Sequence, residues 1–385
     1  MLVSPQRTVI VFSPPSVRSP WIDAFKGLAC IAIVWHHLAF YGPMSDIAQP
    51  LAPALISWLY DYGRMAVQVF LVLGGYLAAA SLAPQGRARF DSASEQIMRR
   101  FVRLVLPYAV ALLVAVLAAA LVRPWLNHAS VPQEPSLAQL LANALLLQDI
   151  VQEEALSAGV WYVAIDFQLF ALVTVLFAAV RALPGLLPER AAGMAQGLVW
   201  VGTAASLGIF NLYPELDMWA VYFFGAYGLG MLAFWAVRAP RALPWVLAMA
   251  VLGALALVQE FRWRIAVAWV MALGLVWVLR TVRQPPPWCV WALGPFQRLG
   301  QMSYSVFLVH FPVCLLVNAL VSQLWPTAPL VNALGMLVAF GLSLASGKVL
   351  YQRVECHVPS WAGALRWQAG LVGTGLMVAL AGNWL

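Results

Sequence analysis

A few ionisable side chains interrupt the apolar segments of this sequence, and they are the residues best suited to chemistry. Lys26 and His37 lie in the first apolar segment, Asp166 in the fourth and His310 in the ninth. A charged or titratable group in hydrocarbon is costly and is usually functional. Histidine is the common general base near neutral pH, and a nearby carboxylate can orient it. We therefore predict that His37, Asp166 and His310 are catalytic.

The first apolar segment carries two polar groups on one helical face. Lys26 and His37 are eleven residues apart, which returns them to within about 20° of each other and separates them by about 16 Å. Lys26 is then expected near the inner membrane boundary and His37 about halfway across or slightly beyond. His36 points about 100° away from His37, so we expect it to be a packing residue.

The other two catalytic candidates each leave an alternative open. Asp166 lies about a turn and a half inside its segment, on the same face as Tyr162. Its alternative role is a structural pair with an intramembrane histidine or arginine. Ser303 and His310 are seven residues apart on one face, beside Pro312. Their alternative role is a polar kink that bridges two helices.

Basic residues near the start of the third segment could bind phosphate. Arg100 and Arg103 share a face there, and guanidinium groups recognise phosphate oxygens through forked hydrogen bonds. With Lys26 they form a predicted cofactor-binding group. The alternatives are a topology signal and binding of lipid headgroups. Lys348, Arg353 and Glu355, at and just after the end of the tenth segment, are interpreted in the same way.

The composition excludes a soluble protein. Of 385 residues, 63% are apolar and only 10% are charged, whereas about a quarter of a soluble domain is normally charged. Apolar runs of about 20 residues suit helices that cross a bilayer core of about 30 Å. The prediction is an all-α, polytopic transmembrane helical bundle of about 10–11 spans. We place these at 21–41, 62–83, 101–122, 159–180, 192–211, 217–237, 243–259, 263–280, 300–322, 328–349 and 365–384, with a re-entrant or interfacial segment at 137–150.

Loop charges predict the orientation and the compartment. Lys and Arg concentrate in alternate loops, which places the N-terminus in the cytoplasm. Residues 1–20, rich in Pro and Ser, are expected to be a disordered cytoplasmic tail without a cleavable signal. The net charge of +7 is then a topology signal and predicts no nucleic-acid partner. The four cysteines lack paired spacing, so neither disulfides nor a metal site is expected.

Six motifs follow one another along the chain: Ile22-Asp-Ala-Phe-Lys26 with His37; Val67-Gln-Val-Phe-Leu-Val-Leu-Gly-Gly-Tyr76; Arg100-Phe-Val-Arg103 with Pro107; Trp161-Tyr-Val-Ala-Ile-Asp-Phe-Gln-Leu-Phe170; Ser303-Tyr-Ser-Val-Phe-Leu-Val-His310; and Tyr351-Gln-Arg-Val-Glu355. In this order they resemble the acyltransferase-3 family of integral membrane acyltransferases. Three positions depart from the family pattern: Lys26 stands for the usual arginine, Gly74 for a serine, and Asp166 for the common glutamate. Without that serine, any role it has in the family is absent here.

The resemblance implies an acyltransferase-3 transmembrane domain at 21–359, mostly of ten helices, followed by an additional helix at 360–385. It implies a cytoplasmic acyl-CoA donor, expected to be acetyl-CoA, and a cell-surface or periplasmic carbohydrate acceptor reached across a bacterial inner membrane whose lipid surrounds the chain. Further residues are expected to contact substrate or to be structural polar groups: Trp161, Gln168, Ser303, Tyr304 and Glu355.

The expected reaction is direct acyl transfer to a hydroxyl that His37 deprotonates, with an acyl-histidine relay as an alternative. A transporter or flippase of a polar or lipid-linked substrate would share the spans and the buried charges, but the two similar halves common in transporters are not visible. A small-molecule acceptor is another alternative. A structural or sensory protein is disfavoured by the buried His and Asp and by the lack of a soluble output domain.

Overall fold

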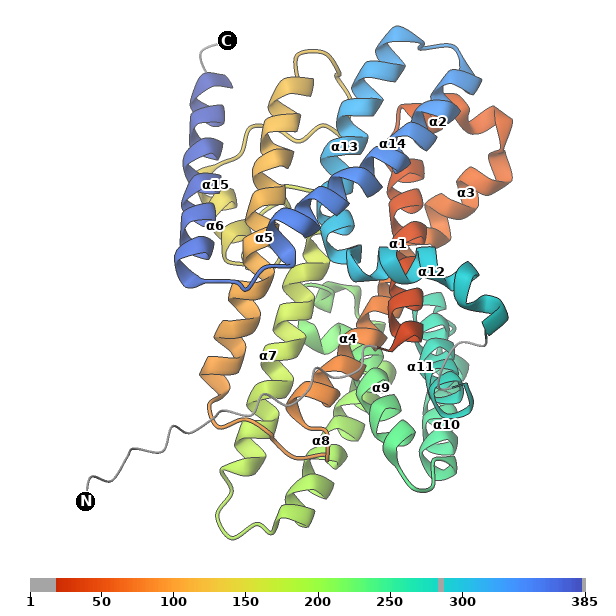
Figure 1. Cartoon of the computed structure of the whole chain (residues 1–385), viewed down its shortest axis with the longest axis vertical. Helices are drawn as coiled ribbons and strands as arrows, with labels where there is room; N and C mark the ends of the chain where they lie inside the picture. Colours follow the sequence, from red (N-terminus) through yellow and green to blue (C-terminus); the bar gives the residue numbers. More distant parts are fainter. Residues whose placement is uncertain (1–18, 283–286, 383–385) are drawn as a thin grey trace, which may run out of the picture.

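The computed structural model describes residues 19–282 and 287–382, and all of its regular elements there are helical. This confirms the predicted all-α bundle (Figure 1). The predicted N-terminal tail lies almost wholly outside the described residues. The α-helices are α1 Pro20–Phe40, α2 Met44–Ala48, α3 Pro53–Tyr62, α4 Ala66–Leu82, α5 Ala93–Val122, α6 Leu137–Ala144, α7 Trp161–Arg181, α8 Pro188–Gly208, α9 Ala220–Arg238, α10 Leu243–Gln259, α11 Trp263–Thr281, α12 Pro287–Gln301, α13 Ser303–Leu324, α14 Pro329–Leu350 and α15 Trp361–Gly382; a π-helical turn, Tyr351–Glu355, extends α14.

Ten helical segments of the described chain are long and apolar enough to cross a membrane. One predicted span, 243–259, is not among these ten: it is α10, whose 17 residues extend only about 25 Å. The second span begins earlier than predicted, because α3 and α4 run on from Pro53 to Leu82. The span count of about 10–11 is therefore confirmed.

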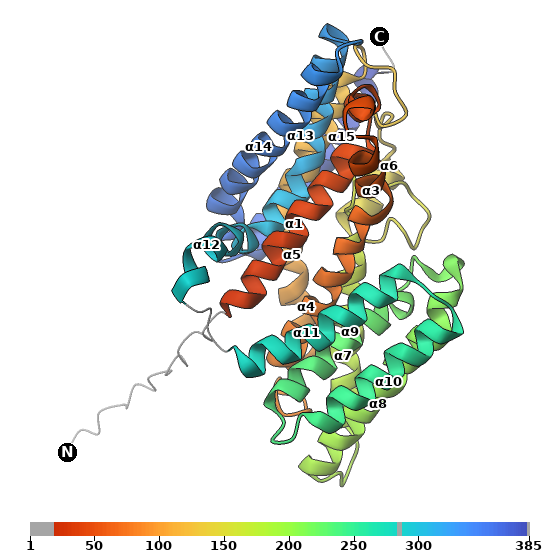
Figure 2. The same cartoon turned by 90° about the vertical axis from the view of Figure 1, so that its right-hand side faces the viewer.

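Helix α12 was not predicted. Its 15 residues include Gln297, Arg298 and Gln301, so it is too short and too polar to be recognised as a span. It lies crosswise to α1 and α13 (Figure 1) and at one edge of the molecule (Figure 2). Its backbone contacts α1 directly, because a Cβ added to Gly27 would meet the Phe296 carbonyl oxygen at 2.1 Å.

The two helices that carry His37 and His310, α1 and α13, are among the most buried spans. We compare the share of buried residues in an apolar stretch of 18 residues from each span. This share is 89% in α9, 78% in α13 and 67% in α1, whereas it is 28% in the spans formed by α8 and α11 and only 17% in α15. The sparsely buried helices line the periphery in Figures 1 and 2. Groups on α1 and α13 therefore face protein rather than lipid.

Helices α4 and α9 are in backbone contact at the centre of the bundle. A Cβ on Gly230 would lie 1.9 Å from the Val72 carbonyl oxygen, and one on Gly75 would lie 1.8 Å from the Tyr227 carbonyl oxygen. Small residues permit such approach, and close packing is a main source of helix association in membranes. This contact fixes the helices that flank the ionisable residues of α5 and α7.

We expect Gly230→Ala to destabilise the protein, because its methyl group cannot fit without separating α4 from α9. Overpacking of this kind costs about 1–3 kcal/mol. Gly274→Ala in α11 is the matched control, since no atom lies within 4 Å of the added Cβ. The midpoint of thermal unfolding in detergent should fall for Gly230→Ala and not for Gly274→Ala, and equal midpoints would contradict this packing.

Candidate active site

Two buried histidines from distant parts of the chain meet in the bundle core. His37 Nδ1 lies 2.6 Å from His310 Nε2, and the two rings are stacked with an interplanar angle of 6°. Relative exposure is 7% for His37 and 0% for His310. The structure thus brings together two of the three predicted catalytic residues.

The hydrogen bonds around this pair assign its protons. His310 Nδ1 lies 2.6 Å from the Phe307 carbonyl oxygen, which can only accept, so His310 carries its proton on Nδ1. In the neutral ring, His310 Nε2 is then an acceptor, and His37 Nδ1 donates to it. This arrangement of protons leaves a lone pair on His37 Nε2, and the hydrogen bond described for the His37 ring is made through Nδ1. In this arrangement His37 Nε2 could accept a proton, and His310 would fix the orientation of the His37 ring.

The free edge of His37 is bordered by Gly159, just before α7. A Cβ on Gly159 would lie 3.1 Å from His37 Cε1 and 3.0 Å from Phe307 Cζ. The φ of Gly159 is +78°, a conformation that L side chains avoid. Both the backbone angle and the space require glycine at this position, and its missing side chain keeps the edge of the imidazole uncovered.

Asp166 pairs with Arg100, the kind of structural partner that one of the two alternatives from the sequence describes. Arg100 Nη2 donates to Asp166 Oδ2, and the guanidinium also lies over the Phe170 ring at 5.3 Å from its centroid. The Asp166 side chain is 7% exposed and that of Arg100 is 31% exposed. Asp166 thus contacts an arginine and not either histidine, and Arg100 is held inside the bundle.

Two tyrosines and a glycine surround this ion pair. Tyr162 and Tyr227 are both in electrostatic contact with Asp166 and Arg100. A Cβ on Gly74 would lie 3.3 Å from Asp166 Oδ1 and 3.2 Å from Tyr227 Cε2. A serine at position 74, as in the resembling family, would therefore place its hydroxyl beside the carboxylate. Here Tyr227 takes up that space.

Aromatic rings connect the ion pair to the histidines. The Tyr162 ring lies 5.8 Å from that of Phe307, and the Phe307 ring lies 5.9 Å from that of His310. The two polar groups therefore belong to one cluster, although their ionisable side chains do not touch.

Glu355 forms a third polar group at the end of α14. Its Oε2 accepts hydrogen bonds from the Ser305 hydroxyl at 2.6 Å and from the Ser305 backbone N–H at 3.2 Å. Lys26 and Arg103 both lie within electrostatic reach of this carboxylate. Tyr304 lies within electrostatic range of both Glu355 and Asp166.

The remaining predicted residues have structural contacts. Gln168 Oε1 accepts from the Ala220 N–H at 3.1 Å, at the start of α9. The Ser303 hydroxyl donates to the Gly300 carbonyl at 2.9 Å, and the Tyr304 hydroxyl donates to the Leu104 carbonyl at 3.0 Å. The ring of Trp161 packs on that of Phe223 at 5.5 Å. These contacts hold α7, α12 and α13 in place around the histidines.

Sequence reasoning missed Gly159 and Tyr227, since neither belongs to a motif with recognisable chemistry. Within residues 19–282 and 287–382, no group of three or more His, Cys, Asp and Glu side chains is arranged to hold a metal ion. His36 donates to the Leu59 carbonyl at 3.0 Å and packs α1 against α3.

Comparison with known proteins identifies the family of the chain. Residues 19–348 match the profile of the acyltransferase-3 family, described as an acyltransferase domain. Comparisons with curated proteins and with solved structures gave no match. Because the matched region covers most of the chain and includes both histidines and the Arg100–Asp166 pair, this protein belongs to the acyltransferase-3 family and is a polytopic membrane acyltransferase.

Proposed function

We propose that the protein transfers an acyl group, expected to be acetyl, from acyl-CoA to a hydroxyl of a cell-surface or periplasmic carbohydrate. The observation that carries this proposal is the buried His37–His310 pair, which leaves His37 Nε2 as a free base. An alcohol is a poor nucleophile until a base accepts its proton, and such catalysis contributes about 10²–10⁴-fold to the rate.

The proposed step is a direct transfer in which His37 is the general base. His37 Nε2 removes the proton of the acceptor hydroxyl while its oxygen attacks the thioester carbonyl carbon. The C–S bond breaks, and the proton passes from His37 to the departing thiolate. The products are an O-acyl ester and free CoA. During the step His310 accepts a hydrogen bond from His37 Nδ1–H, so it stabilises the imidazolium that forms.

We place the donor on the cytoplasmic side of a bacterial inner membrane and the acceptor on the other side. This rests on the alternation of basic loops and on the family's expected use of acyl-CoA. Lys26, Arg103 and Glu355 lie on the donor side in this arrangement.

Acyl-CoA consumption tests the proposed reaction. Membranes that contain the protein and a crude envelope glycan fraction should release free CoA thiol faster than membranes from a strain lacking the gene. A transporter would not consume the thioester. Equal thiol release with and without the protein, in the presence of acceptor, would contradict the proposed donor.

We expect His310→Ala to lower kcat for acyl transfer about 10²-fold and to leave KM for the donor nearly unchanged. The variant removes the acceptor that fixes the tautomer of His37. His310→Gln retains an acceptor oxygen and should restore part of kcat. An unchanged kcat in His310→Ala would show that His37 needs no such orientation.

A further inference from the structure

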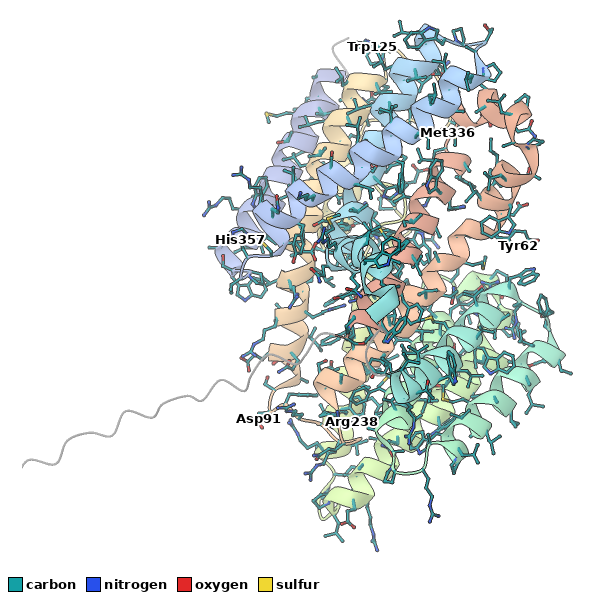
Figure 3. All side chains as sticks on the ribbon, turned by 45° about the vertical axis from the view of Figure 1, so that its right-hand side comes forward. Tyr62, Asp91, Trp125, Arg238, Met336 and His357 are labelled. Atoms are coloured by element: carbon teal, nitrogen blue, oxygen red, sulfur yellow. The ribbon has the colours of Figure 1, made fainter. Side chains whose placement is uncertain are left out.

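A basic cavity lies at the end of the bundle opposite Trp125. Its volume is about 510 Å³, and it is lined by Arg87 and Arg89 of the loop between α4 and α5 and by Arg238 at the end of α9. Figure 3 shows Arg238 and Asp91 at this end of the molecule. A second cavity of about 270 Å³ shares Arg87 and adds Arg181. Their volumes suit a small-molecule ligand or part of one.

The loop that carries two of these arginines is fixed by hydrogen bonds. The Arg89 N–H donates to the Leu82 carbonyl at 2.8 Å, and Trp235 Nε1 donates to the Ala83 carbonyl at 2.9 Å. Arg181 Nη2 donates to the Asp91 carbonyl. The loop backbone is thus tied to α7 and α9, and it presents the exposed side chains of Arg87 and Arg89 beside that of Arg238 at the cavity.

The positive charge of this cavity is not neutralised by the protein. None of the described carboxylates forms an ion pair with Arg87, Arg89 or Arg238. Arg238 lies over the Phe234 ring at 5.4 Å, and Arg87 donates only to the amide oxygen of Gln85. A topology signal accounts for basic residues in this loop, but it does not require them to converge on one cavity. Three unpaired guanidinium groups around a cavity are suited to phosphate oxygens.

We propose that this cavity binds the phosphate-bearing nucleotide end of the acyl-CoA donor, an inference that rests on the proposed function. Arg100, the sequence-based candidate for this role, is already paired with Asp166. The cavity lies at the end of α9, eleven residues or about 16 Å along that helix from Tyr227 beside the ion pair. An acyl-CoA separates its phosphates from its thioester by a long flexible arm, so the two ends of one donor would occupy different sites.

Equilibrium binding of labelled CoA to the purified full-length protein tests the proposal. Adenosine 3′,5′-bisphosphate, which has phosphates but no pantetheine arm, should displace CoA from the wild type. The triple variant Arg87→Gln, Arg89→Gln and Arg238→Gln should bind CoA about tenfold or more weakly. Arg366→Gln in α15 is the matched control and should bind CoA as the wild type does. In transfer assays KM for acyl-CoA should rise in the triple variant, while kcat at saturating donor stays the same.

The possible outcomes distinguish failure of the cavity proposal from failure of the proposed acyl transfer. Wild-type CoA affinity in a triple variant that unfolds at the wild-type temperature would overturn the cavity proposal and leave the reaction intact. The same result with loss of co-purified anionic phospholipid would assign the cavity to lipid headgroups and also overturn it. CoA binding that depends on the three arginines, in a protein that transfers no acyl group, would support the cavity and contradict the proposed reaction.

Discussion

His37→Asn is expected to lower kcat for acyl transfer by about 10²–10⁴-fold, the usual contribution of a general base. The asparagine amide can still donate a hydrogen bond to His310 Nε2, as His37 Nδ1 does in the wild type. The variant therefore loses the free basic nitrogen and keeps the contact between α1 and α13. The measurement is the rate of ester formation at saturating acyl-CoA with purified protein.

His36→Asn is the matched control for this variant. His36 is the neighbouring histidine, and its ring donates to the Leu59 carbonyl, a contact that an asparagine amide can replace. We expect its kcat to stay close to that of the wild type. If both variants lost activity equally, helix packing rather than base catalysis would explain the result. Acyl label trapped on wild-type protein without acceptor, and absent from His37→Asn, would replace direct transfer with an acyl-histidine relay.

Asp166→Asn is expected to destabilise the fold by about 3 kcal/mol, because it leaves the charge of Arg100 without its partner. Breaking a buried ion pair by removing one partner costs about 3–5 kcal/mol. The lower end of this range of free energies applies here, because the Arg100 side chain is 31% exposed and solvent can partly stabilise its charge. The measurement is the free energy of unfolding in mixed detergent micelles.

The double variant Arg100→Gln with Asp166→Asn tests whether the pairing itself is responsible. Two neutral amides can hydrogen-bond to each other, so the double variant should be more stable than the sum of the two single effects predicts. Additive effects would show that Arg100 and Asp166 do not interact energetically. Activity measured on the same proteins would show separately whether the pair contributes to transfer.

The helices could be predicted from sequence because hydrocarbon imposes a simple rule. Each span must be about 20 apolar residues long, and the predicted segments correspond to the helices α1 to α15 with few exceptions. The segment at 137–150 begins with the short helix α6 and continues in turns. Helix α12 was not predicted because, with 15 residues, it is too short and not apolar enough for a span.

The partners within the site could not be predicted from the sequence. The sequence predicts two histidines, one aspartate and several arginines within or at the ends of the spans, and only packing decides which of them meet. His37 and His310 are 273 positions apart, and their contact depends on how α1, α12 and α13 cross. The sequence around Gly159 does not indicate a role for this glycine. Its role depends on a backbone φ of +78° and on its position beside the His37 ring, which is distant in the sequence.

Mass spectrometry of O-acyl groups on total envelope glycans is the most direct test of the proposed acyl transfer. Wild type, a gene deletion and His37→Asn would be compared in the native host at matched membrane levels. We predict that one defined ester is lost in the deletion and equally in His37→Asn. Retention of that ester in His37→Asn would remove His37 as the base, and identical glycan esters in all three strains would contradict transfer to an envelope carbohydrate.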